Sequence, residues 1–96
     1  MAMSTYYMFG KYSIGAISEM SPSRTDECTK VIEEYGGEII LMHALLGEHD
    51  LVFIVNFPDN ESALKASLVL TRITGIAFST APATSVDHFD KVVESL

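Results

Sequence analysis

The segment at residues 51–57, LVFIVNF, is apolar at nearly every position. A strand with one face in water alternates apolar and polar residues, so a strand of this kind is covered on both faces. A chain of 96 residues has few helices with which to cover both faces of a sheet. We therefore expect another copy of the chain to supply the second cover.

Composition points the same way. The length predicts one domain, residues 1–96, with a core of limited size. Hydrophobic residues make up 48% of the chain, which leaves apolar surface for a partner. Insertion into a membrane is the competing explanation. It fails because the apolar runs are far shorter than the roughly 20 residues that span a bilayer.

The charge balance narrows the class of partner. A formal net charge of −7 repels phosphate groups, so we expect neither nucleic acid nor an anionic membrane as a partner. The single cysteine, Cys28, cannot form a disulfide within the chain, and the first residues do not resemble a secretion signal. These features favour a cytoplasmic location. No residue cluster predicts a metal or a cofactor.

Residue patterns predict the order β-α-β-β-α-β-α. Strands are expected at residues 5–12, 39–46, 51–57 and 76–81, the last stopped by Pro82, with an irregular turn at residues 13–20. Helices are expected from Ser21-Pro22 to Gly36, over residues 61–74 with a cap at Asp59 or Asn60, and from a cap at Ser85 to the end.

Each helix has one apolar face. The expected stripes are Cys28, Val31, Ile32 and Tyr35; Ala63, Ala66, Leu70 and Ile73; and Phe89, Val92, Val93 and Leu96. The connection rules then favour the ferredoxin-like split βαβ fold of the α+β class. It is a four-stranded antiparallel sheet with two helices on one face, and the first and third strands lie in the centre.

The faces of the sheet follow from the hairpin that joins the second and third strands. If Leu46 lies opposite Leu51, one wholly apolar face faces the helices. It carries Ile40, Met42, Ala44, Leu46, Leu51, Phe53, Val55 and Phe57. The other face is still apolar but holds two polar side chains, His43 and Asn56, which are expected to lie near each other. It carries Ile39, Leu41, His43, Leu45, Val52, Ile54 and Asn56.

Short elements recur in an order that is similar to a known family. They are Gly36-Gly37, Gly47-Glu48-His49-Asp50, Pro58-Asp59 and Gly75. The chain resembles the GYD domain family over residues 6–86, with His49 standing where the family has the tyrosine of its Gly-x-Tyr-Asp element. The resemblance implies a ferredoxin-like fold of the dimeric α/β-barrel type and supplies no reaction.

Three residues are candidates for binding a ligand. His43 is either a ligand-binding or proton-transfer group in a cavity between sheets, or a structural histidine hydrogen-bonded across an interface. Asn56, in an apolar strand, either orients a ligand or pairs with a polar group of its surroundings. Tyr12 lines a pocket or belongs to the core or an interface.

The turn residues Gly47, His49 and Asp50 form a second candidate group. An imidazole and a carboxylate supply two metal ligands, but no third is placed by spacing. The competing interpretation is that Asp50 binds backbone amides of the turn. Cys28 is expected to be a small core residue.

Two functions remain open. The first is a homo-oligomeric domain that binds a small, mainly apolar molecule between sheets. The second is a cofactor-independent monooxygenase or isomerase of the dimeric α/β-barrel kind that uses His43 and Asn56. Only analogy of fold supports the second, and one fold hosts many functions.

Overall fold

The structure is a computed structural model that describes residues 2–96. Its strands are β1 (Ser4–Tyr12), β2 (Glu38–Ala44), β3 (Leu51–Phe57) and β4 (Ile76–Ala83). Its helices are α1 (Ile14–Ser18), α2 (Pro22–Glu34), α3 (Asn60–Thr74) and α4 (Val86–Glu94).

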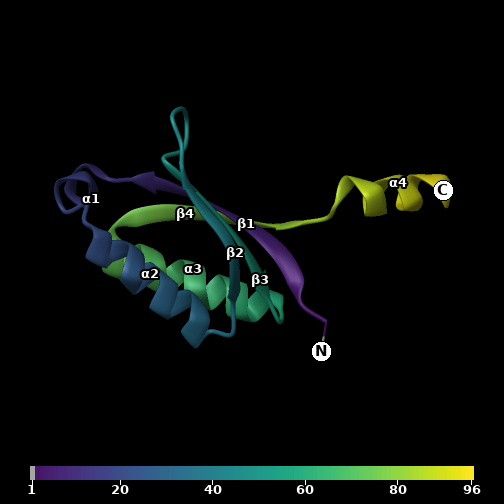
Figure 1. The fold of residues 1–96 in the computed structure, drawn as a ribbon, viewed down its shortest axis with the longest axis horizontal. Helices are drawn as coiled ribbons and strands as arrows, with labels where there is room; N and C mark the ends of the chain where they lie inside the picture. The colour runs from purple at the N-terminus through teal and green to yellow at the C-terminus, as the bar shows by residue number, and fades with distance from the viewer. Residues whose placement is uncertain (1) are drawn as a thin grey trace.

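The four strands form one antiparallel sheet in the order β2-β3-β1-β4. Figure 1 shows α2 and α3 together on one face of this sheet, while no helix of residues 2–96 covers the other face. The α+β class, the ferredoxin-like topology and the central position of the first and third strands are confirmed.

The core lies between the two helices and the central strands. From α2 it takes Cys28, Val31 and Ile32, as predicted. The small residues of α3 let that helix pack closely on the sheet, and Ala63, Ala66 and Leu70 are buried there. The prediction for Ile73 was wrong, because its side chain is 45% exposed while Ser67 and Thr74 are buried instead.

The helix ends follow local chemistry. The Asp59 carboxylate caps α3 by accepting a hydrogen bond from the Ser62 amide at 2.7 Å, and the Ser85 hydroxyl caps α4 in the same way. Gly75 ends α3 with φ at 74°, where a residue with a Cβ is strained. Ser21 stands at the cap position of α2, but its side chain makes no capping bond.

Three element boundaries differ from the prediction. Strand β2 ends at Ala44, which lies opposite Leu51, so the expected pairing of Leu46 with Leu51 was wrong and Leu46 is exposed. The segment after β1 is not irregular, because α1 forms there with its first turn capped by the Ser13 hydroxyl. Strand β4 continues through Pro82, which pairs with Tyr6. A proline lacks an N–H, but β4 is an edge strand, so the free side of the sheet loses no hydrogen bond.

A bulge in β2 corrects part of the face assignment. Ile39 lies opposite Val55 and Leu41 lies opposite Ile54, so Ile40 is an extra residue in the strand. Ile39 therefore packs against the core, and Ile40 is 56% exposed, the reverse of the predicted faces. Beyond the bulge, His43 lies opposite Val52, on the predicted face.

The last helix stands apart from this body. In Figure 1, α4 projects from the end of β4, away from the sheet and the other helices. None of its residues is buried. Within residues 2–96, no helix has the length and apolar character needed to cross a bilayer.

Candidate functional site

The side of the sheet away from α2 and α3 is here called the open face. The pairing of the strands places mostly apolar side chains on it. They are Thr5, Tyr7, Phe9, Lys11, Glu38, Leu41, His43, Val52, Ile54, Asn56, Ala77, Ser79, Ala81 and Ala83. Tyr7 is 37% exposed, and Phe9, Leu41 and Ile54 are partly exposed.

The prediction that His43 and Asn56 lie near each other was wrong. His43 lies opposite Val52, whereas Asn56 lies opposite Glu38 at the other end of the same strand pair. Val52 and Asn56 are four positions apart along β3, about 13 Å at the rise of a strand. The Asn56 carbonyl accepts a hydrogen bond from the Thr5 hydroxyl at 2.7 Å, which satisfies it within the sheet. Within one chain, His43 and Asn56 therefore lie too far apart to contact the same group of a bound molecule.

The tip of the β2–β3 hairpin folds back onto the end of β1. The Asp50 amide donates to the Gly10 carbonyl, and the Asp50 carboxylate accepts from the Tyr12 amide, both at 2.8 Å. The carboxylate thus continues the hydrogen bonding of β1 beyond the last β1–β3 pair, Gly10 with Leu51. Asp50 does bind a backbone amide, but one of another strand rather than one of its own turn.

The other turn residues hold the hairpin tip in place. Gly47 has φ at 149°, a conformation that only glycine adopts without strain. The His49 ring packs on Phe9, with ring centroids 5.0 Å apart, and Lys11 donates to the Glu48 carbonyl at 2.8 Å. Gly47, His49 and Asp50 therefore have structural roles in this chain. Within residues 2–96, no three His, Cys, Asp or Glu side chains gather as a metal site would require.

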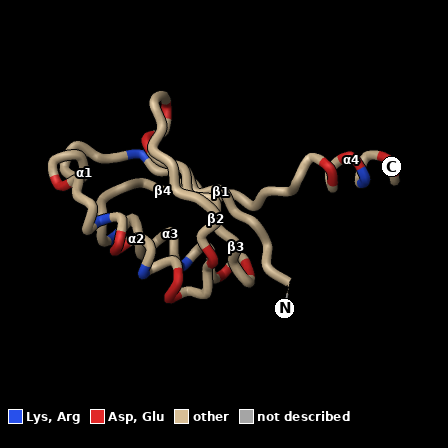
Figure 2. Tube along the Cα trace, viewed as in Figure 1, with Lys and Arg blue, Asp and Glu red and all other residues tan. Residues whose placement is uncertain are grey.

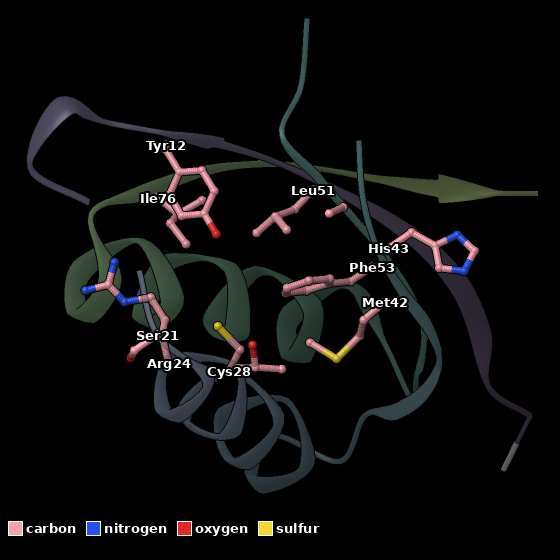
Figure 3. A pocket seen from close by; sticks show the side chains of 11 residues that line it. Tyr12, Ser21, Arg24, Cys28, Met42, His43, Leu51, Phe53 and Ile76 are labelled. Atoms are coloured by element: carbon pink, nitrogen blue, oxygen red, sulfur yellow. The ribbon is translucent and has the colours of Figure 1, made fainter. Parts of the chain in front are cut away.

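A cavity of about 200 Å³ lies on the helix side of the sheet. Figure 3 shows side chains from β1, β3 and α2 directed into one space, among them Tyr12, Phe53 and Cys28. The lining is mainly apolar and also includes Met42, Leu51 and Ile76. Tyr12 thus lines a pocket, but under the helices and not between sheets. His43 also borders this cavity, but its imidazole points away from the space in the same view.

Arg24 is the cation at the border of this cavity. Its guanidinium is bonded to the Glu19 carboxylate at 3.0 Å and to the Ala16 carbonyl at 3.2 Å, which ties α2 to α1. Burial raises the pKa of the Cys28 thiol from its ordinary 9.0 to about 11, with Glu27 adding to the effect and Arg24 opposing it. The thiol is therefore neutral near pH 7, and the cavity wall suits a neutral, apolar guest.

Sequence patterns did not reveal this cavity. Met42 and Phe53 were assigned correctly to the helix side, but nothing in their spacing shows that space remains between them and α2. No sequence pattern singled out Arg24. Its role depends on α1, which the sequence did not predict.

Solved structures with a similar fold share little sequence with this chain. The 30S ribosomal protein S6 of Thermotoga maritima aligns at a TM-score of 0.60 and 16% identity, covering 97% of this chain and 99% of that one. An AsnC family transcriptional regulator from Agrobacterium tumefaciens aligns at 0.59 and 17%, covering 86% and 51%. At such identities the likeness shows the fold alone.

A third structure, the leucine response regulatory protein LrpA of Mycobacterium tuberculosis, aligns at a TM-score of 0.56 and 11% identity, covering 85% of this chain and 51% of that one. This chain thus spans about half the length of both regulators. No curated protein matches the chain. The model of the GYD domain, however, matches residues 6–93, nearly its whole length. The chain therefore belongs to the GYD domain family.

Proposed function

We propose that this GYD domain is a self-associating domain whose copies pair through the open face. One observation supports this above the others: the open face carries Tyr7, Phe9, Leu41 and Ile54 with no helix over them. Burial of an aliphatic or aromatic side chain favours association by roughly 1.5–3 kcal/mol. Monomeric proteins rarely leave so continuous an apolar surface in water.

Light scattering after size exclusion tests this proposal. The unmodified chain is expected to elute as a dimer or a larger assembly at micromolar concentration. Ile54→Lys, which puts a charge in the middle of the open face, is expected to give monomers with an unchanged circular dichroism spectrum. The matched control is Leu64→Lys, because Leu64 is 58% exposed on α3, on the opposite side of the sheet. A monomeric parent chain at these concentrations would contradict the proposal.

A specific observation also favours binding of a small, mainly apolar molecule. The cavity beside Tyr12 and Cys28 has apolar walls, a neutral thiol and a phenol hydroxyl available for one hydrogen bond. Its volume of about 200 Å³ is below the roughly 300–1,000 Å³ typical of drug-sized ligands, so the guest is a small one. We place this site under the helices, in preference to the predicted one between sheets.

Native mass spectrometry of freshly purified protein would reveal a retained ligand together with the number of subunits. As a direct probe, 4-fluorophenol can be titrated and followed by fluorine NMR. Cys28→Met, which extends a side chain into the cavity, is expected to weaken binding several-fold. Lys30→Met on the exposed side of the same helix serves as control. Equal binding by both variants would contradict this location.

We further propose that the protein works in a reducing compartment such as the cytoplasm, because its cysteine is a buried free thiol. The enzymatic alternative gains no support from the geometry. A base must reach its proton within about 2.6–3.2 Å, directly or through one water. His43 and Asn56 lie at opposite ends of a strand pair.

A further inference from the structure

The helix α4 has the pattern of a packed helix, but within residues 2–96 it does not pack on any surface of its own chain. None of its residues is buried, and Phe89 is 58% exposed and Val86 is 72% exposed. The radius of gyration is 14.4 Å, larger than the roughly 12.5 Å expected for a compact chain of this length. The projecting helix seen in Figure 1 contributes to the difference.

The residues of α4 are fully sorted by polarity. At about 100° of rotation per residue, the apolar side chains fall within an arc of about 120°. This stripe, named here the α4 stripe, consists of Val86, Phe89, Val92 and Val93 of the helix together with Leu96, which lies two residues beyond its end. Every polar residue lies outside that arc. A helix of this length is marginal in water by itself, so a stripe so well formed implies a surface that covers it.

Charge argues against a membrane as that surface. Three acidic residues, Asp87, Asp90 and Glu94, stand against one Lys91 on the helix, as the colours of Figure 2 show for this end of the chain. Helices that lie on anionic membranes carry an excess of Lys and Arg on the polar face. The α4 stripe therefore requires an apolar protein surface.

The amount of apolar surface favours a second copy of this chain as that protein. Burying one exposed apolar side chain is worth roughly 1.5–3 kcal/mol, at about 25 cal/mol for each Å² of apolar surface. Each such side chain therefore removes roughly 60–120 Å² of surface from water. Tyr7, Phe9, Leu41 and Ile54 are already partly buried, so they would contribute at most roughly 240–480 Å² per copy, short of the roughly 800 Å² per partner of a standard interface. The five residues of the α4 stripe add roughly 300–600 Å², and together the two surfaces reach that size.

The two surfaces are also continuous. Where α4 leaves β4, the open face has an unfilled hollow of about 470 Å³, lined by Thr5, Tyr7 and residues 81–85. A helix packed beside this hollow would extend the apolar contact beyond the edge of the sheet.

We propose that α4 of each copy crosses to the other copy and packs its apolar stripe there, completing the interface that begins at the open face. This proposal rests on the self-association proposed above. The contact is reciprocal, because in a two-fold dimer each copy offers the same surface and receives the same arm. The interface is incomplete without α4.

Sedimentation velocity of the full chain tests the contact. Phe89→Asp combined with Val93→Asp places two charges in the α4 stripe and is expected to raise the dissociation constant of the dimer at least 100-fold. The matched control, Asp90→Asn combined with Glu94→Gln, changes the polar side of the same helix and is expected to leave the constant within about threefold. Hydrogen exchange adds a direct readout: amides of α4 are expected to be protected in the parent dimer and unprotected in monomeric Ile54→Lys.

The outcomes separate the two proposals. A dimeric parent chain with an unchanged constant in the stripe variant and unprotected α4 amides would overturn the role of α4 and leave self-association standing. Protection of α4 in monomeric Ile54→Lys would show that the helix packs on its own chain, and would also overturn it. A monomeric parent chain, or an Ile54→Lys variant that remains dimeric, would overturn both proposals.

Discussion

Asp50 joins the β2–β3 hairpin to β1 through a charged acceptor. Its carboxylate receives the Tyr12 amide at 2.8 Å, and without it that amide at the end of β1 loses its partner. Loss of a hydrogen bond to a charged group costs roughly 1.5–3 kcal/mol. We expect Asp50→Ala to lower the free energy of unfolding by about that amount, as measured by urea denaturation.

The control for Asp50 is the neighbouring Glu48→Ala. The backbone carbonyl of Glu48 accepts a hydrogen bond from the Lys11 ammonium, and alanine keeps that carbonyl. The substitution is therefore expected to change the free energy of unfolding by less than about 0.5 kcal/mol. A loss at Glu48 as large as the loss at Asp50 would show that the hairpin tip is sensitive to any change.

Single residues also mark the limit of prediction from sequence. An aspartate at the turn was expected to accept backbone hydrogen bonds, and it does, but its partner lies 38 residues away. No local pattern contains that contact. His43 and Asn56 were assigned to the correct face, because face follows the two-residue period of a strand. Their separation along the sheet depends on the register of the pairing, which the sequence left as an assumption.

At the level of elements, the cap of α3 gives a pH dependence. The Ser62 amide and hydroxyl hydrogen-bond the Asp59 carboxylate and lower its pKa from its ordinary 3.8. A lowered pKa in the folded state gives stability that is present above the ordinary pKa and lost as the pH falls through the lowered value. We expect the unfolding free energy of the parent chain to fall more steeply below pH 4 than that of Asp59→Asn, which caps without titrating. Parallel slopes in urea titrations at each pH would contradict this role.

The junction between α2 and β2 depends on Gly37. A Cβ there would lie 2.6 Å from Ile32 Cγ2 and 2.8 Å from Phe57 Cε1, so the core would have to shift. Gly37→Ala is expected to lower the free energy of unfolding by roughly 1–3 kcal/mol. Gly15→Ala is the matched control, because a Cβ in α1 meets nothing within 4 Å, and alanine there is expected to raise stability by roughly 0.5–1 kcal/mol. Thermal unfolding of both variants measures the contrast.

Element boundaries were predictable where a residue has one local role. Glycine and proline signals placed the ends of α2 and α3 within one or two residues. The bulge at Ile40 gave no signal, because Ile39 and Ile40 are both apolar and either could face the core. The cavity beside Tyr12 is likewise a gap between elements, and it follows from packing and not from pattern.

At the scale of the whole molecule, the apolar character of both faces of β3 correctly indicated its place in the centre of the sheet. The helices α2 and α3 lie on one face of the sheet only, as the predicted order of elements requires. The projecting position of α4 was not predicted, although its apolar stripe was. Amphipathic spacing shows that a helix has a buried side; it does not show whether its own chain supplies the cover.

A chain that folds as a dimer should become more stable as its concentration rises, because association then contributes to the folded state. The unfolding entropy is about 2.1 cal/mol/K per residue, so two chains of 96 residues give about 0.4 kcal/mol/K. A tenfold rise in concentration adds about 1.4 kcal/mol per dimer and should raise Tm by about 3 °C. Circular dichroism melts of the parent chain at about 2, 20 and 200 µM measure this shift. Each tenfold step in concentration is expected to raise Tm by about 3 °C. Monomeric Ile54→Lys should melt at one temperature at all three concentrations, and the same flat profile in the parent chain would mean that its fold does not depend on a partner.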